Sequence, residues 1–333
     1  MNLLIKTALA ETLRVTGALR LGEAIARAQG SIVFGLHRVL PVEEMSDCYN
    51  PYLTVTPESF DAFLGWLKQC YRIVSVPELL SSAAPVCCLT FDDGWEDNFR
   101  VAFPILQEHG ASATIFLATG LIDTDAMLPE ERLWRVWQSA SRQDRLPEVS
   151  RTMDAGETIS YSEAQRRFKQ TPTVSKIALL TRLEQALSPD KPKRRSFMTW
   201  DQIRIMRSAG IDFGSHSVLH TGLGAEQDSV IRQELSGSFQ LLRDQISSDP
   251  KYLAYPNGLY DDRVIRLAQE TGYEAAFTTL RGRVKANACS RFELPRMPLD
   301  NMVANSSDGR FSEARTRLHI LRESWPASRE FTY

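Results

Sequence analysis

The chain has 333 residues, of which 43% are hydrophobic and 24% charged, with 18 Gly and 16 Pro. These values are typical of a globular protein and exclude the collagen-like, coiled-coil and disordered classes. Lys and Arg number 39 against 41 acidic residues, a balance that argues against nucleic acid as the main partner. The five Cys are spread thinly with no CxxC pair, which disfavours a disulfide framework and favours a reducing compartment.

The N-terminal segment repeats Leu and Ala at helical spacing, with Arg14, Arg20 and Arg27 among them. We predict an amphipathic helix within residues 1–30 that packs on the rest of the protein; peripheral contact with a membrane surface is the alternative. Lys6 and Glu11 interrupt the apolar run, so we expect no signal peptide. No stretch is long enough for a transmembrane segment, and a cytoplasmic location is the default expectation.

Short apolar runs alternate with amphipathic stretches, which is the βα pattern of a parallel sheet or barrel. Capping residues predict helices after Thr56 and Thr199, and Gly110 and Gly272 predict helix ends. An α/β fold follows. The seven predicted strands are 31–36, 71–76, 86–91, 112–118, 210–215, 252–255 and 274–279.

The region from about residue 123 to 195 does not continue this alternation of strands and helices. It holds helical pieces between Pro- and Asp-containing turns, and closes with the basic turn KPKRR (191–195). We interpret it as a helical insertion within a catalytic barrel that spans 31–300. The basic turn is a solvated loop or, alternatively, a grip on an anionic substrate. Residues 301–333 form a polar C-terminal tail with one helix.

The first candidate site is the segment CLTFDDGWEDN (88–98). A buried strand ends there in two adjacent carboxylates, Asp92 and Asp93, where α/β enzymes place catalytic groups. Adjacent strand residues point in opposite directions, so the two can serve one site only if the chain turns, which Gly94 permits. A capping or turn role for both Asp is the alternative.

The second candidate site follows another strand and carries His216 and His220. Two imidazoles four residues apart can converge on one metal ion. Together with one Asp they form a three-ligand site with an open position for water, as hydrolytic zinc requires.

TFDDG (90–94), HSVLH (216–220) and AYPNG (254–258) resemble the first three motifs of the polysaccharide deacetylase family, also called carbohydrate esterase family 4 or the NodB homology domain. The resemblance covers most of the chain outside residues 1–30, the insertion and the tail. It implies a distorted (β/α) barrel of about seven strands, a divalent metal that is usually Zn²⁺, and hydrolysis of N-acetyl groups on sugars.

Carried onto this chain, the resemblance makes Asp92 the general base, and makes Asp93, His216 and His220 the metal ligands. Tyr255, Pro256 and Asn257 of the third motif would contact substrate, with a backbone N–H near Asn257 facing the developing oxyanion.

Two departures from the family pattern affect the catalytic assignment. The Arg that usually opens the third motif is replaced by Ala254, and Arg296 is our candidate substitute. The late motif that supplies a general-acid His is not recognisable, and His37, after the first strand, is our candidate, as in circularly permuted members. A structural role for His37 is the alternative, and His319 is expected at the surface. Trp95 is a candidate surface for a sugar ring.

The sequence thus predicts a metal-dependent hydrolase acting on carbon–nitrogen bonds other than peptide bonds. Its substrate would be an N-acetylated bacterial glycan or precursor, as in exopolysaccharide biosynthesis. An O-acetyl esterase, a deformylase, a non-catalytic sugar-binding module and a magnesium phosphotransferase are the alternatives. The last would not need His216 and His220, since imidazoles prefer zinc-like metals.

Overall fold

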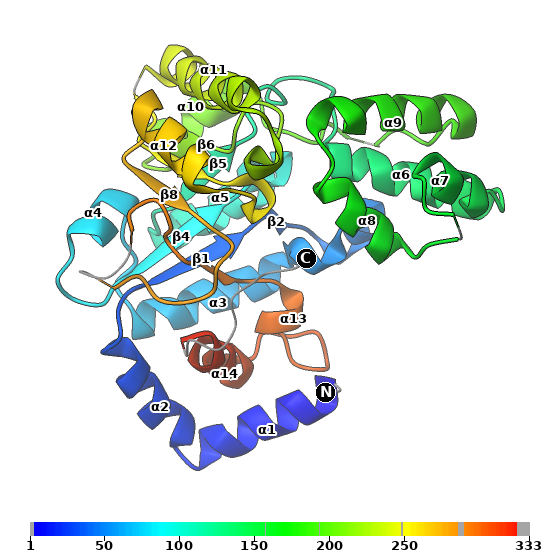
Figure 1. Cartoon of the computed structure of the whole chain (residues 1–333). Coiled ribbons are helices and arrows are strands. Elements are labelled where there is room, and N and C mark those ends of the chain that lie inside the picture. Colours follow the sequence, from blue (N-terminus) through cyan, green and yellow to red (C-terminus); the bar gives the residue numbers. More distant parts are fainter. Residues whose placement is uncertain (1–2, 157, 193, 248, 286–289, 325–333) are drawn as a thin grey trace.

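The computed structural model describes residues 3–156, 158–192, 194–247, 249–285 and 290–324. Its centre is a curled sheet of seven parallel strands in the order β8-β7-β6-β5-β4-β1-β9 (Figure 1). The strands are β1 (Ile32–Leu36), β4 (Cys87–Phe91), β5 (Thr114–Leu117), β6 (Asp212–Ser215), β7 (Tyr252–Ala254), β8 (Ala275–Phe277) and β9 (Met297–Pro298). A separate parallel pair joins β2 (Arg38–Val39) to β3 (Thr54–Val55). The predicted α/β class and distorted barrel are confirmed.

One segment connects the two edges of the curled sheet. Leu294 forms a parallel bridge with Phe277 at the end of β8, and Met297 pairs with Phe34 of β1. The same short stretch therefore contacts the first and the last strand of the barrel. It carries Arg296 between these two pairings.

Side chains on the strands alternate between the barrel interior and the helices outside it. Ile32 and Phe34 of β1 pack outward in the large core cluster. Val33 packs inward with Cys88 and Phe116 from the neighbouring strands. This alternation fixes which residues point inward where the strands end.

Helices surround the sheet, and the four helix ends predicted from capping residues fall at Thr56, Gly110, Thr199 and Gly272. Thr56 accepts a hydrogen bond from Ser59 N at the start of one helix, and Thr199 and Gln202 form the predicted capping box of another. The helices are α3 (Pro57–Cys70), α4 (Val76–Ser81), α5 (Phe103–His109), α10 (Trp200–Ser208), α11 (Asp228–Ile246) and α12 (Asp262–Thr271). Shorter turns are η1 (Val42–Asp47), η2 (Pro51–Leu53), η3 (Asn98–Ala102), η4 (Leu223–Ala225) and η5 (Pro256–Gly258).

Four helices lie within the predicted insertion and form a lobe at one side of the barrel (Figure 1, green). They are α6 (Pro129–Arg142), α7 (Leu146–Thr152), α8 (Tyr161–Lys169) and α9 (Thr173–Leu187). Leu133, Phe168 and Leu180, from three of these helices, pack together as a small buried cluster. Lys193, within the basic turn, lies outside the described residues.

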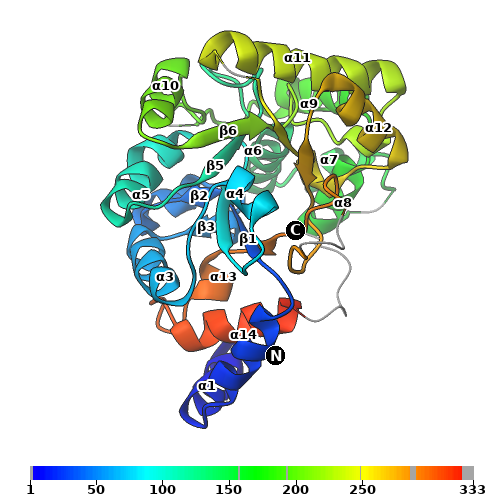
Figure 2. The ribbon, with the colours of Figure 1, turned by 90° about the vertical axis from the view of Figure 1, so that its left-hand side faces the viewer.

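The N-terminal segment is two helices rather than the single one we expected. α1 (Leu3–Val15) and α2 (Ala18–Arg27) meet at Gly17, whose φ of +77° breaks the helical path. The C-terminal region holds α13 (Asn301–Ala304) and α14 (Glu313–Ser324), which packs beside α1 and α2 (Figure 2). His319 on α14 is buried, so the expectation that it lies at the surface is wrong.

One predicted strand, 71–76, is absent. Ile73 makes a single bridge to Cys87, and Val76 already begins α4, with Pro77 in its first turn. Proline suits that position and cannot donate to a strand ladder, which explains the difference. The seventh strand is instead β9. Within the described ranges, no helix is both long and apolar enough to cross a membrane.

Candidate active site

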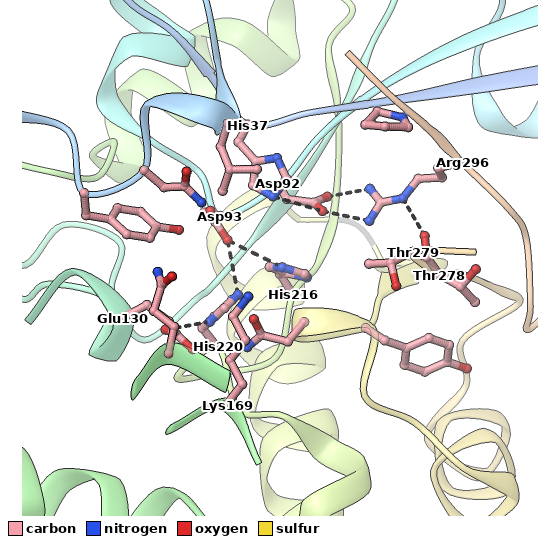
Figure 3. Close-up of a pocket in the computed structure, with 18 residues that line it drawn as sticks. His37, Asp92, Asp93, Glu130, Lys169, His216, His220, Thr278, Thr279 and Arg296 are labelled. Atoms are coloured by element: carbon pink, nitrogen blue, oxygen red, sulfur yellow. Dashed lines mark hydrogen bonds and ion pairs between the residues drawn. The ribbon is translucent and has the colours of Figure 1, made fainter. Parts of the chain in front are cut away.

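Three predicted site residues follow the carboxyl ends of three strands. His37 comes after β1, Asp92 after β4 and His216 after β6. Carboxyl ends of parallel strands meet at one end of a barrel, and the alternation that points Cys88 inward points Asp92 inward as well. All three line one cavity together with Asp93 and His220 (Figure 3).

Asp93, His216 and His220 bring three possible metal-ligand atoms within 4.8 Å of one another. The Nε2 atom of each imidazole lies 3.5 Å from Oδ1 of Asp93. Asp93 reaches the same cavity as Asp92 because the chain turns there, with φ of +76° at Asp93 and +84° at Gly94. This is the turn that Gly94 was expected to permit.

These three residues fit a divalent cation. Oδ1 of Asp93 is buried and has no hydrogen-bond partner among the described residues, a costly state for a carboxylate oxygen unless a cation compensates it. Two imidazole nitrogens and one carboxylate oxygen are a donor set typical of zinc sites that keep an open position. The other oxygen, Oδ2, accepts a hydrogen bond of 2.8 Å from Nε1 of Trp95.

The backbone fixes the tautomer of His216. Its Nδ1 lies 2.8 Å from the carbonyl oxygen of Ala254, and since a carbonyl only accepts, Nδ1 carries the proton and donates it. The lone pair of Nε2 then faces Asp93, the arrangement that metal-binding histidines require. Burial lowers the pKa of His216 to about 4, although Asp92 opposes this shift.

Glu130, in the first turn of α6, is a site residue that sequence reasoning missed. It is buried, and its Oε2 lies 3.3 Å from Nδ1 of His220. Its Oε1 accepts a hydrogen bond of 3.1 Å from Nδ2 of Asn257. Burial alone would raise the pKa of Glu130, but His220 outweighs burial and keeps the pKa well below its ordinary value. The insertion thus supplies a carboxylate that orients a candidate metal ligand.

Arg296 holds the candidate base. Its Nη1 and Nη2 donate to Oδ1 and Oδ2 of Asp92, each at 2.7 Å. Its Nε donates to the Thr278 carbonyl at 3.0 Å, and Nη1 also donates to the Thr90 hydroxyl at 3.3 Å. Burial would raise the pKa of Asp92, but the guanidinium outweighs it and holds the pKa well below its usual range. The contact is the one proposed for Arg296 in place of an Arg at position 254.

His37 lies beside the candidate base. Its Nε2 is 3.9 Å from Oδ2 of Asp92, and its side chain lines the cavity. Burial lowers the pKa of His37, while Asp93 and Asp92 oppose that shift. The structure therefore brings His37 to the same cavity as Asp92, and its role as general acid stays a prediction.

The third motif lies at the cavity only in part. Tyr255 and Asn257 line it, whereas Pro256 is buried beneath and is not among the lining residues. Trp95 is only 1% exposed and stacks on Phe197 with ring centroids 5.0 Å apart. The prediction that its ring offers a surface to a sugar is therefore wrong, because the ring is sealed in the core and its N–H serves Asp93.

Several cavity residues had no signal in the sequence, and most of them come from loops or from the insertion. Gln165 and Lys169 reach the cavity from α8, so the insertion contributes to the cavity wall as well as to the metal-ligand region. Burial lowers the pKa of Lys169, and Glu130 opposes this. The other unexpected lining residues are Gly35, Tyr49, Asn50, Leu53, Thr278, Thr279 and Pro298.

Comparisons with known proteins show which family this chain resembles. The polysaccharide deacetylase family model matches residues 81–276, more than half of the chain. A curated protein of Bacillus subtilis (strain 168), "Putative polysaccharide deacetylase YxkH", is 21% identical over 270 residues, which cover 79% of this chain and 71% of that protein.

Solved structures share the fold. Streptococcus pyogenes deacetylase PplD, in complex with acetate, matches with a TM-score of 0.57 and 21% identity, covering 89% of this chain and 99% of that one. IcaB from Ammonifex degensii matches with a TM-score of 0.56 and 16% identity, covering 89% of this chain and 98% of that one. A de-N-acetylase from Aggregatibacter actinomycetemcomitans matches with a TM-score of 0.57 and 19% identity, covering 87% of this chain and 99% of that one.

Proposed function

Because the chain belongs to the polysaccharide deacetylase family, we propose that it hydrolyses N-acetyl groups on the amino sugars of a polysaccharide or its precursor. The observation that carries the proposal is one cavity in which a carboxylate held by Arg296 stands beside the Asp93, His216 and His220 cluster. Metal-assisted hydrolysis of an amide requires a proton acceptor next to a bound cation.

Asp93, His216 and His220 would hold the divalent cation, which we propose to be Zn²⁺ from the donor set. When bound, such a cation lowers the pKa of water and polarises a carbonyl oxygen. Two neighbours orient the ligands: the Ala254 carbonyl fixes His216, and Glu130 faces Nδ1 of His220. Trp95 fixes the carboxylate of Asp93 through its N–H.

Asp92 accepts the proton of the attacking water. The Arg296 pair keeps Asp92 ionised and fixes the plane of its carboxylate. Attack forms a C–O bond to the acetyl carbon, the C–N bond then breaks, and the products are acetic acid and a free amine, which become acetate and the ammonium form in water.

The leaving amine needs a proton, and His37 is placed to donate it. Its Nε2 lies 3.9 Å from Oδ2 of Asp92, so the proton that Asp92 takes from water has a short path to the imidazole. One proton thus moves from water to base, from base to His37 and from His37 to the amine, and the protein ends as it began.

The size of the cavity supports a small acyl group as the part that enters it. About 40 Å³ of it is open to the centres of water-sized spheres, enough for a few water molecules. We expect the acetyl group to enter and the sugar to remain outside. Gln165 and Lys169 are among the residues that line the cavity.

The test is acetate release from oligosaccharides of N-acetylglucosamine, with O-acetylated glycans assayed in parallel and metal content measured on the same samples. We expect one zinc-like ion per chain and acetate from the N-acetylated set. Asp92→Asn should lower kcat by about 10²–10⁴-fold, and His216→Ala should lose both metal and activity. His109→Ala is the matched control, since His109 pairs with Asp61 away from the cavity.

Acetate from O-acetylated glycans alone would reassign the enzyme to an esterase. A protein that stays metal-free after repletion and releases no acetate would overturn the hydrolase and leave a binding module.

A further inference from the structure

The outward side of the two N-terminal helices exposes a set of large apolar side chains that the proposed function does not use. We call it the outer N-terminal face. Thirteen large hydrophobic residues are exposed in the described chain, and six of them belong to this short segment. They are Leu4, Ile5, Leu9, Val15, Leu21 and Ile25, with exposed fractions from 42% to 76%.

The face lies opposite a side that is already packed. Ala10 and Leu19 are buried against Ala314 of α14, with Leu318 and Leu321 beside them. α1 and α2 are therefore apolar on two sides, and among the described residues the inner side packs on α14. In Figures 1 and 2 both helices lie at the edge of the molecule, with α14 between them and the barrel.

The spacing shows that the exposed residues form continuous stripes. At about 100° per residue, Leu4, Ile5, Leu9 and Val15 fall within an arc of about 140° on α1. Leu21 and Ile25 are one turn apart on α2. Helices with a wide apolar stripe facing water are built to bury it against something else.

The segment carries a net positive charge, with Lys6, Arg14, Arg20 and Arg27 against Glu11 and Glu23. The two acids of the segment are both neutralised: Glu11 pairs with Arg14 at 2.7 Å, and the buried Glu23 pairs with Arg27 at 3.3 Å and also with Arg317. Within the part of the chain that the structure describes, no acid lies within ion-pair distance of Lys6 or Arg20.

From this combination we infer that the outer N-terminal face docks on the surface of an anionic lipid bilayer. Apolar side chains enter the region between headgroups and acyl chains, and Lys6 and Arg20 meet the lipid phosphates. A second copy of the chain fits less well. A two-fold interface sets the same patch against itself and would bring these unpaired cations of the two copies together.

The test is co-sedimentation of the whole protein with vesicles of phosphatidylcholine alone and of phosphatidylcholine mixed with phosphatidylglycerol. We expect binding to the mixed vesicles that weakens as salt rises. Ile25→Glu should weaken this binding by about tenfold or more, because it replaces a buried apolar side chain with a charge repelled by the lipid.

Ile205→Glu on α10 is the matched control, since Ile205 and Ile25 are both 52% exposed. It should bind vesicles as the wild type does. The double variant Lys6→Gln/Arg20→Gln should reduce the preference for phosphatidylglycerol. Circular dichroism and acetate release confirm that each variant is folded, and neither depends on this face.

Three results would overturn the inference. One is no vesicle binding by the wild type; another is equal loss of binding in Ile25→Glu and Ile205→Glu. The third is a dimer in analytical ultracentrifugation that Ile25→Glu dissociates while vesicles bind nothing, which would make the face an interface between copies.

Discussion

Asp92 and Arg296, which are 204 residues apart in the sequence, form an ion pair with two hydrogen bonds of 2.7 Å each. Both side chains are about 95% buried, so each charge depends on the other for compensation. Arg296 reaches Asp92 because its segment joins the edges of the barrel, beside β1 and β8. The pairing shows how the chain supplies a guanidinium at a site where the third motif has Ala254.

Arg296→Ala should reduce kcat and shift the acid limb of the pH–rate profile to higher pH. Removing the guanidinium raises the pKa of Asp92, because burial is then opposed only by His216 and His37 among the main causes. The carboxylate form is therefore lost at a higher pH than in the wild type. A single-turnover pH profile measures the shift.

Arg296→Lys is the control for this prediction. It keeps a positive charge but loses the paired hydrogen bonds, so the acid limb should move less while kcat still falls. An acid limb that is unchanged in Arg296→Ala would contradict the role of Arg296 in keeping Asp92 ionised.

Sequence reasoning located the candidate site residues that directly follow buried strands and carry metal-binding or proton-transfer groups. Asp92, Asp93 and the two histidines of HSVLH follow buried strands, and their placement at one barrel mouth follows from the parallel sheet together with the turn at Asp93 and Gly94. The prediction of a strand at 71–76 is wrong because the same apolar pattern also fits a capped helix. Pro77, in the first turn of α4, favours the helix. The prediction that Trp95 contacts a sugar is wrong for another reason: no sequence pattern reveals whether an aromatic ring after a strand faces inward or outward.

Glu130 could not be found from the sequence. An acid after Pro129 at the start of a helix looks like an ordinary first-turn residue that complements the helix dipole. Its neighbour Glu131 has the same pattern, yet it pairs with Arg135 instead. Only the placement of the insertion over the barrel separates the two. The boundaries of the catalytic unit, 31–300, and the cytoplasmic location stay predictions.

Glu130→Gln should weaken metal binding by about 10–100-fold, the usual effect of removing the partner of a ligating histidine. The amide no longer attracts the proton on Nδ1 of His220, so the ring is held less firmly toward Asp93. Competition with a chromophoric chelator measures the affinity without relying on activity.

Glu131→Gln is the matched control for Glu130→Gln, because Glu131 is a buried neighbour on the same helix that contacts no candidate ligand. Metal affinity should remain at the wild-type level in this variant. Equal weakening in both variants would mean that the helix, and not the carboxylate, supports the site.

Trp95→Phe should lower metal affinity by about 10–100-fold while leaving KM for oligosaccharides unchanged. The substitution keeps an aromatic ring against Phe197 but removes the N–H that donates to Asp93, and a hydrogen bond to a charged group contributes about 1.5–3 kcal/mol. A raised KM with unchanged metal affinity would instead place the indole in contact with the sugar.

Acid should destabilise the protein partly through His319 of α14, which is not among the residues that line the cavity. Burial lowers the pKa of His319 to about 4, although Glu323 opposes the shift. Between about pH 6.5 and pH 4 the unfolded chain binds a proton that the folded chain does not, so stability falls as the pH drops through this window. At pH 5 this one group accounts for a loss of about 2 kcal/mol relative to pH 7.

Urea unfolding of the wild type and His319→Gln at pH 7 and pH 5 measures that contribution. His37 and His216 titrate in the same direction, so the difference between the two proteins, and not the slope of either, is the quantity that isolates His319. The variant should lose about 2 kcal/mol less than the wild type between the two pH values. Equal losses would mean that the imidazole accepts a proton in the fold without cost, and that α14 opens locally before the barrel does.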